Sequence, residues 1–271
     1  MTKGILKENT VSKKAQNITN KLAPVIALLV VVLIWLGISE GEIVPAYMLP
    51  SPIAVVSAFI TNFSVMMEQA YVTLQESVYG LLIGIALAFI MATLMDRFNF
   101  LKKALYPILV VTQTIPTIAI APLLVLWMGF GMAPKITLVV VTTFFPIAVG
   151  LLNGYESVDK DAINLMRAMG ATRLQIFRYV KFPTALPAFF SGLRISAAYA
   201  VVGAVVSEWL GGFEGLGVYM TRVKKAYAFD KMFAVIIFIS VISLLLMGLI
   251  TLIEKSSMPW KHKNNMVQTN N

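Results

Sequence analysis

Six long apolar segments divide this chain, and they constrain its fold more than any other feature. Each is close to the ~20 residues that an α-helix needs to cross the ~30 Å hydrocarbon core of a bilayer. Transmembrane β-barrels use ~10-residue stretches of alternating polarity, which these runs do not resemble. The sequence therefore predicts an all-α integral membrane protein with six transmembrane helices, at about residues 22–39, 75–95, 104–130, 136–152, 188–210 and 232–253.

The composition excludes most soluble classes. Apolar residues make up 58% of the chain and charged residues only 13%, whereas soluble domains are about 25% charged. A soluble enzyme, a disordered regulator and a disulfide scaffold are thereby excluded. The chain has no cysteine and a single histidine, His262, so we expect no metal site built on these residue types.

The first apolar segment has two interpretations, a cleaved signal peptide or a retained helix. It is long for a signal peptide, and Glu40-Gly41-Glu42 follows it where a cleavage site would need small residues. We therefore expect a retained helix. The organisation that follows is a cytoplasmic N-terminal tail (1–21), a six-span domain (22–254) and a cytoplasmic C-terminal tail (255–271).

The distribution of basic residues predicts the orientation. Sixteen of the 22 Lys and Arg residues fall on the side of the two termini and five on the other side, Lys135 among them. Because basic residues concentrate in cytoplasmic segments, both termini are predicted to be cytoplasmic. The last outer loop departs from this pattern, since it carries Arg222, Lys224, Lys225 and Lys231.

The outer segment between the first two spans contains a helix start. Ser51 suits the N-cap position and Pro52 the first helical position. The apolar residues that follow fit either a helix lying in the membrane interface or a packed extracellular helix.

The longest inner segment, 153–187, is predicted to form two short helices. Ser157 or Asp159 could cap the first, and Gly170 suits its end, where a left-handed residue is needed. Thr172 and Gln175 form a capping box for the second. That helix is expected to end before Pro183.

The pair is expected to expose both apolar and basic groups. Such a surface suits either docking into a groove of a soluble partner or resting on anionic lipid. The residues are Leu165, Met166, Arg167, Met169, Arg173, Ile176, Phe177 and Arg178.

The spacing in this loop resembles that of bacterial ABC importer permeases. Nine residues separate Gly170 from Val180, and one residue separates Val180 from Phe182-Pro183. The family pattern is Glu-Ala-Ala, three residues, Gly, nine residues, Ile, one residue, Leu-Pro. The positions of Glu-Ala-Ala hold Asn164-Leu165-Met166 instead, with Asp161 one turn earlier.

Other segments resemble the nitrate, sulfonate and taurine branch of that family. They are Leu49-Pro50-Ser51-Pro52, Gln113-Thr114-Ile115-Pro116, and Ser207-Glu208-Trp209-Leu210-Gly211-Gly212 with Gly215-Leu216-Gly217. The run 166–220 is most similar to permeases proposed to import thiamine precursors such as hydroxymethylpyrimidine. The substrate stays open between a pyrimidine and a sulfonate, taurine or nitrate type of anion.

The resemblance implies a type I ABC importer permease in a bacterial cell membrane. Two permease chains, expected to be a homodimer, would bind two cytoplasmic ATPase subunits and receive solute from an extracytoplasmic binding protein. The chain has no Gly-x-x-x-x-Gly-Lys-Ser/Thr motif, so ATP and Mg²⁺ would be bound by the partner, and this chain would be neither an enzyme nor a nucleic-acid binder. The residues implied in ATPase docking are Asp161, Asn164, Leu165, Met166, Gly170, Ala171, Val180, Phe182 and Pro183.

Glu208 lies near the outer end of the fifth span and has three interpretations. It could line the pathway or gate, pair with the basic outer loop, or lie exposed at the interface. Gly211, Gly212, Gly215 and Gly217 permit either an ordinary turn or a re-entrant segment with close backbone approach. The resemblance favours a segment that shapes the outer mouth.

Further residues inside the spans are predicted to line or shape the pathway. Gln113 could line the pathway or hydrogen-bond between helices, and Pro116, Pro122 and Pro146 should kink their spans. Arg194 is expected to reach lipid phosphates. The predicted pathway or gate set is Gln113, Pro116, Glu208, Trp209, Gly212, Gly215 and Gly217, and Arg222, Lys224 and Lys225 are predicted to dock the binding protein.

Two alternatives belong to other classes. An ion-coupled secondary transporter would need several intramembrane ion-coupling groups and commonly inverted repeats. A membrane enzyme would need clustered catalytic groups, and Asp159 with Asp161 is a poor constellation.

Overall fold

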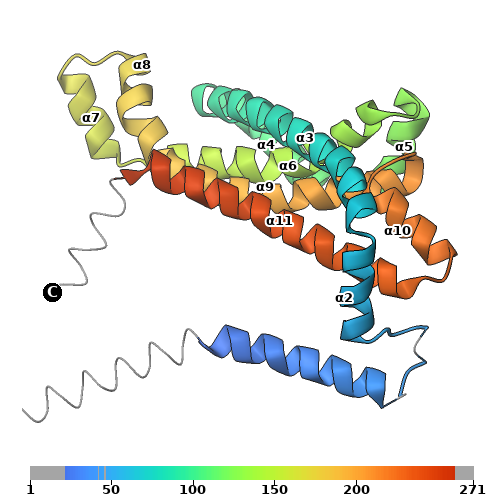
Figure 1. The fold of residues 1–271 in the computed structure, drawn as a ribbon. Coiled ribbons are helices and arrows are strands. Elements are labelled where there is room, and N and C mark those ends of the chain that lie inside the picture. The colour runs from blue at the N-terminus through green and yellow to red at the C-terminus, as the bar shows by residue number, and fades with distance from the viewer. Residues whose placement is uncertain (1–21, 42, 46, 260–271) are drawn as a thin grey trace, which may run out of the picture. The chain divides into compact units, whose positions relative to one another are not determined.

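The computed structural model describes residues 22–41, 43–45 and 47–259, and in these residues helix is the regular secondary structure throughout. The predicted tails 1–21 and 260–271 lie outside the described residues. Within these residues five helices are long and apolar enough to cross a membrane, or six if one bent pair of helices is counted as a single span. Figure 1 shows their arrangement. The elements are a helix at Leu22–Glu40, α2 (Pro52–Thr61), α3 (Phe63–Arg97), α4 (Asn99–Thr112), α5 (Thr117–Met128), α6 (Met132–Glu156), α7 (Lys160–Ala168), α8 (Arg173–Ile176), η1 (Phe177–Lys181), α9 (Phe182–Gly211), α10 (Leu216–Lys225) and α11 (Phe229–Ser257).

The described residues form two compact units. One consists of the residues up to Asn62 with Val223–Ala234, and the other contains Phe63–Arg222 and the residues from Val235 onward. In the first unit, the Trp35 indole donates a hydrogen bond of 3.0 Å to the Pro50 carbonyl. The predicted start of α2 is confirmed, because the Ser51 hydroxyl accepts from the Ala54 amide.

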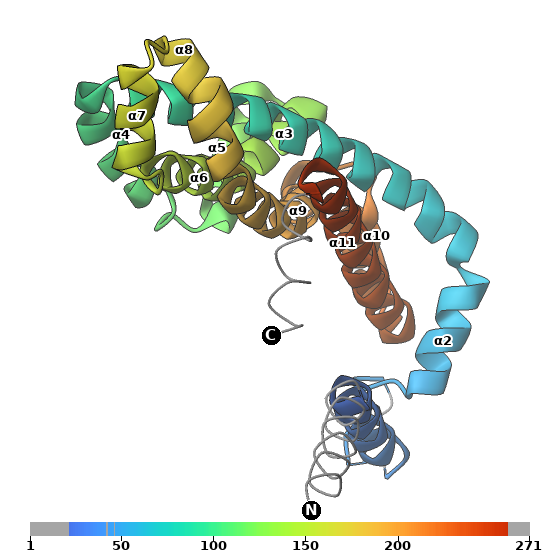
Figure 2. The same cartoon turned by 90° about the vertical axis from the view of Figure 1, so that its left-hand side faces the viewer.

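The core of the second unit is built by α3, α6 and α9, which lie side by side (Figures 1 and 2). Small residues allow α6 and α9 to approach closely. A Cβ atom on Gly154 would lie 2.7 Å from Ala185 Cα, and one on Gly150 would lie 2.8 Å from the Ala188 carbonyl oxygen. Close packing of small residues is one of the interactions that hold helices together in lipid, and these three closely packed helices carry the sites described below.

The third predicted span, 104–130, is not one continuous helix. It consists of α4 and α5, which meet at 101° across Gln113–Pro116. Pro116 lacks an amide hydrogen and disfavours helical geometry in the residue before it, so the helix stops there. At 1.5 Å per residue the two pieces are roughly 21 and 18 Å long, and neither alone crosses ~30 Å of hydrocarbon. Pro122 and Pro146, by contrast, lie inside continuous helices.

Candidate functional site

The two short inner helices start and turn as predicted. Asp159, not Ser157, caps α7, because its carboxylate accepts from the Asp161 amide at 2.9 Å. Gly170 takes the left-handed conformation, with φ +80°. Thr172 and Gln175 form both hydrogen bonds of a capping box at the start of α8. The starts of both helices and the bend between them are therefore set by local sequence signals.

The end of the second helix corrects a prediction. The helix does not stop before Pro183 but continues through the π-helical turn η1 into α9, so that one helix runs from Arg173 to Gly211. In the wider turn the Phe182 amide donates to the Phe177 carbonyl, five residues earlier. A π-turn inserts one extra residue into the helix and changes which backbone amide donates to each carbonyl. The helix can therefore continue past a proline, which has no amide hydrogen to donate. The short helix α8 is thus continuous with one of the long apolar helices.

The exposed face of the pair differs in part from the predicted one. Leu165 and Met169 are exposed as expected, and Leu174 is 75% exposed. Ile176 is buried instead, and the Phe177 ring lies 5.4 Å from the Tyr155 ring. Because α8 continues into α9, its inner face joins the core of the membrane helices, and the prediction of exposure for these two residues was wrong.

The predicted docking residues fall into two groups. Asp161, Asn164 and Leu165 are exposed on α7. Val180, Phe182 and Pro183 are half-buried in the continuous helix, and the Phe182 ring lies 6.0 Å from Phe89 of α3. The first group can meet a partner, whereas the second joins the helix pair to the spans. Met166, Gly170 and Ala171 lie between them, at the end of α7 and the bend.

Glu208 is buried, with 1% of its surface exposed, which rules out its interpretation as an exposed interfacial acid. The Thr73 hydroxyl donates to its Oε1 at 2.7 Å, and the Gly217 amide donates to its Oε2 at 2.6 Å. Among the described residues, no ion pair joins Glu208 to Arg222, the basic residue of α10 that belongs to the same unit.

An ion pair that the sequence did not predict lies beside Glu208. Lys135 Nζ lies 2.6 Å from Glu76 Oε1, and both side chains are almost fully buried. The sequence pattern places Lys135 among the charges of an outer loop and assigns no role to Glu76. The missed signal was a carboxylate inside a predicted span, which requires a partner in the same bundle. We call Gln69, Thr73, Glu76, Lys135 and Glu208 the outer polar cluster.

The glycine-rich segment after α9 is folded against this cluster. Gly215 has φ +117°, and its amide donates to Gln69 Oε1 at 2.8 Å. A Cβ atom on Gly215 would overlap the Glu208 carboxylate, and one on Gly217 would lie 2.9 Å from Glu208 Oε2. The close backbone approach considered from the sequence is therefore present, and Gly212 also packs against the Glu208 backbone. The cluster ties α3, α6 and α9 to the segment that follows α9.

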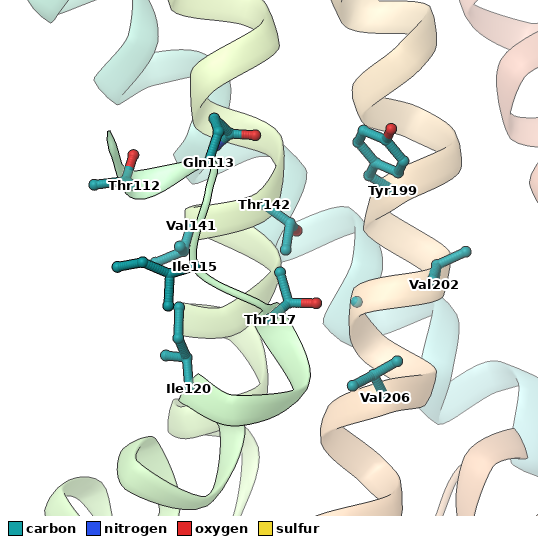
Figure 3. A pocket seen from close by; sticks show the side chains of 11 residues that line it. Thr112, Gln113, Ile115, Thr117, Ile120, Val141, Thr142, Tyr199, Val202 and Val206 are labelled. Carbon is teal, nitrogen blue, oxygen red and sulfur yellow. The ribbon is translucent and has the colours of Figure 1, made fainter. Parts of the chain in front are cut away.

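A pocket of about 220 Å³ opens where α4 and α5 break (Figure 3). Gln113, predicted to line the pathway, extends from the break toward α9, where Tyr199 stands across the gap. Pro116 is exposed at the break, and Trp209 is not among the lining residues. Every lining side chain is uncharged: Thr112, Gln113, Ile115, Thr117, Ile120, Val141, Thr142, Tyr199, Val202 and Val206, with Gly203.

Two further ion pairs connect the long helices. Arg194 pairs with Glu254 of α11, a protein partner that the sequence did not predict. Lys181 lies 2.7 Å and 2.8 Å from the two carboxylate oxygens of Asp96. Arg222, Lys224 and Lys225 are exposed on α10. The part of the chain that the structure describes holds no group of three His, Cys, Asp or Glu residues suited to a metal ion.

Comparisons with known proteins agree on one family. A family model described as "Binding-protein-dependent transport system inner membrane component" matches residues 80–258. The formylaminopyrimidine transport permease protein ThiX of Halalkalibacterium halodurans is 37% identical over 89% of this chain and 97% of its own length. The taurine transport system permease protein TauC of Escherichia coli is 28% identical over 86% of this chain and 87% of its own length. A solved inward-facing structure of the MetNI methionine ABC transporter has the same fold, with a TM-score of 0.64 at 20% identity over 72% of this chain and 97% of that chain.

Proposed function

This chain belongs to the binding-protein-dependent transport system inner membrane components, and we propose that it carries a small uncharged heterocycle through the membrane. It is a permease subunit of an ABC importer with a type I fold, as the sequence pattern predicted. The uncharged pocket at the α4–α5 break is the observation that carries the choice of substrate class.

The substrate class follows from the chemistry of the pocket. A sulfonate entering a partly dehydrated site needs a cationic or strongly donating partner, and no lining side chain carries charge. Amide and hydroxyl groups, with one aromatic ring, match the mixed donors and acceptors of a nitrogen heterocycle. At about 220 Å³, the pocket is smaller than the ~300–1,000 Å³ typical of sites for drug-sized ligands, which suits a solute of a single ring. The relative ThiX is named for a pyrimidine.

The partners follow from the inner helix pair and from the family. We propose that α7 and α8 dock on a cytoplasmic ATPase subunit, which binds ATP and Mg²⁺ and performs hydrolysis. Exposed Leu165 and Met169 would enter a groove of that subunit. Two copies of this chain would form the path, with both termini in the cytoplasm, and an extracytoplasmic binding protein would deliver the solute.

The helix from Arg173 to Gly211 supports a direct mechanism for coupling. Closure of the ATPase pair would displace α8, and the uninterrupted helix would tilt α9 against α3 and α6. Because α9 also carries Tyr199 and Glu208, the same tilt would change the shape of the pocket. It would also shift the contacts of Glu208 within the outer polar cluster. Each conformation of the permease would be favoured when the ATPase subunits are in the nucleotide state that binds that conformation more tightly.

The pocket assignment is tested by removing its polar groups one at a time. Gln113→Leu and Tyr199→Phe should each lower heterocycle uptake roughly 5- to 30-fold, the effect of losing about 1–2 kcal/mol of hydrogen bonding. Tyr79→Phe is the matched control, since Tyr79 is also about half exposed on a span but lies outside the pocket. If both pocket variants took up as much solute as Tyr79→Phe, the pocket would not be part of the pathway.

Docking of the binding protein is proposed for the basic end of α10. Lys224 and Lys225 are exposed there, and reversing both to Glu should slow association with an acidic partner face. The expected result is a tenfold or greater drop in the association rate at low salt, measured by surface plasmon resonance on permease in nanodiscs. An unchanged rate would place the docking surface elsewhere.

A further inference from the structure

A second hollow lies at the inner end of α3, beside the short helices α7 and α8. Its volume is about 650 Å³. The predicted docking residues Leu165 and Met169 do not line it, so an occupant would leave them exposed. The lining residues are Thr93, Leu94, Asp96, Arg97, Ile163, Arg167, Arg173, Leu174, Ile176, Phe177 and Lys181.

The hollow carries an excess of positive charge. Four cations, Arg97, Arg167, Arg173 and Lys181, face one carboxylate, that of Asp96. Lys181 neutralises Asp96 through two short contacts. The three arginines form no ion pair within the described ranges, so three like charges converge on one cavity. An anion that accepts bidentate hydrogen bonds would relieve their repulsion.

The hollow also has an apolar side. Leu94 is 38% exposed and Leu174 is 75% exposed, although both line it. Arg97 and Asp96 directly follow the uncharged part of α3, which places the arginines at the depth of the lipid headgroups if α3 spans the membrane. A ligand that fills the hollow should therefore be anionic at one end and apolar at the other.

We propose that this hollow is a binding site for an anionic phospholipid of the inner leaflet. The phosphate is held by Arg97, Arg167 and Arg173, and an acyl chain lies along Leu94 and Leu174. Basic pockets beside membrane helices on the cytoplasmic face bind such headgroups. Because Arg167 lies on α7 and Arg173 on α8 while Arg97 ends α3, a bound lipid bridges the ATPase-docking helices and a span. The site does not depend on which solute is carried.

The test uses the full-length permease purified in detergent. Phosphatidylglycerol should bind and raise the melting temperature, whereas phosphatidylcholine at the same concentration should not. In native mass spectra, the combined variant Arg97→Gln, Arg167→Gln and Arg173→Gln should retain at least tenfold less phosphatidylglycerol. Arg178→Gln is the matched control, because Arg178 is an exposed arginine of the neighbouring turn that does not line the hollow.

Three outcomes would overturn the proposal. The first is that the triple variant and Arg178→Gln retain equal amounts of phosphatidylglycerol. Circular dichroism of each single variant would check that it is folded correctly. The second is equal stabilisation by inorganic phosphate or glycerol 3-phosphate, which would make the site one for a free anion. The third is displacement of the lipid by the ATPase subunit, with loss of ATPase binding in the triple variant, which would assign the arginines to the protein partner.

Discussion

Replacing Gly170 with proline should abolish association with the ATPase subunit while leaving membrane insertion intact. Gly170 has φ +80°, whereas proline is held near −65°. Its amide donates to the Arg167 carbonyl, and the next amide donates to the Met166 carbonyl. Proline removes the first bond and forbids the turn that makes the second, so α7 and α8 lose their mutual angle. We expect at least a tenfold loss of co-purified ATPase, equivalent to ~1.4 kcal/mol or more.

Gly170→Asn is the matched control for this variant. No atom lies within 4 Å of a Cβ at this position, so bulk alone is tolerated. Asparagine adopts the left-handed conformation more readily than other side chains. Near-normal amounts of the ATPase subunit should therefore co-purify with the asparagine variant. Normal co-purification with the proline variant would show that the bend is not the docking element.

Replacing Lys135 with methionine should destabilise the permease by roughly 3–5 kcal/mol, because it leaves a buried carboxyl group without its counter-charge. The Lys135 and Glu76 side chains are 6% and 0% exposed, and Lys135 also reaches the Glu214 carbonyl at 3.4 Å. The loss should appear as a lower melting temperature of the purified protein. Uptake should fall with it, since the outer polar cluster holds the segment after α9.

Two comparisons isolate the buried pair. Lys135→Met combined with Glu76→Met should recover most of the stability, because replacing both partners of a buried pair with apolar side chains is often neutral. Lys102→Met breaks the exposed pair with Glu156 and should cost less than about 1 kcal/mol. A melting temperature for Lys135→Met equal to that of Lys102→Met would contradict a stabilising role for the cluster.

Much of the fold could be predicted from local sequence patterns. Apolar runs located the spans, and side-chain caps located α2, α7 and α8, because these signals involve residues only a few positions apart. The spacing between Gly170 and Pro183 also identified the family correctly.

Features that depend on distant residues were not predictable in the same way. Glu76 and Lys135 are 59 positions apart, and only the packing of α3 on α6 brings them together. The inward face of Ile176 depends on the π-turn that joins α8 to α9. The bend at Pro116 was expected as a kink, but its 101° angle depends on how both pieces pack. The pocket beside it needs α9 to supply Tyr199.

Solute uptake into vesicles tests the central claim most directly. Permease, ATPase subunit and binding protein would be reconstituted together, with a radiolabelled pyrimidine outside and ATP on the ATPase side. We predict accumulation that requires ATP and all three proteins and that persists when proton and sodium gradients are collapsed. Accumulation driven by an ion gradient in vesicles that contain the permease alone would contradict the assignment and would identify a secondary transporter.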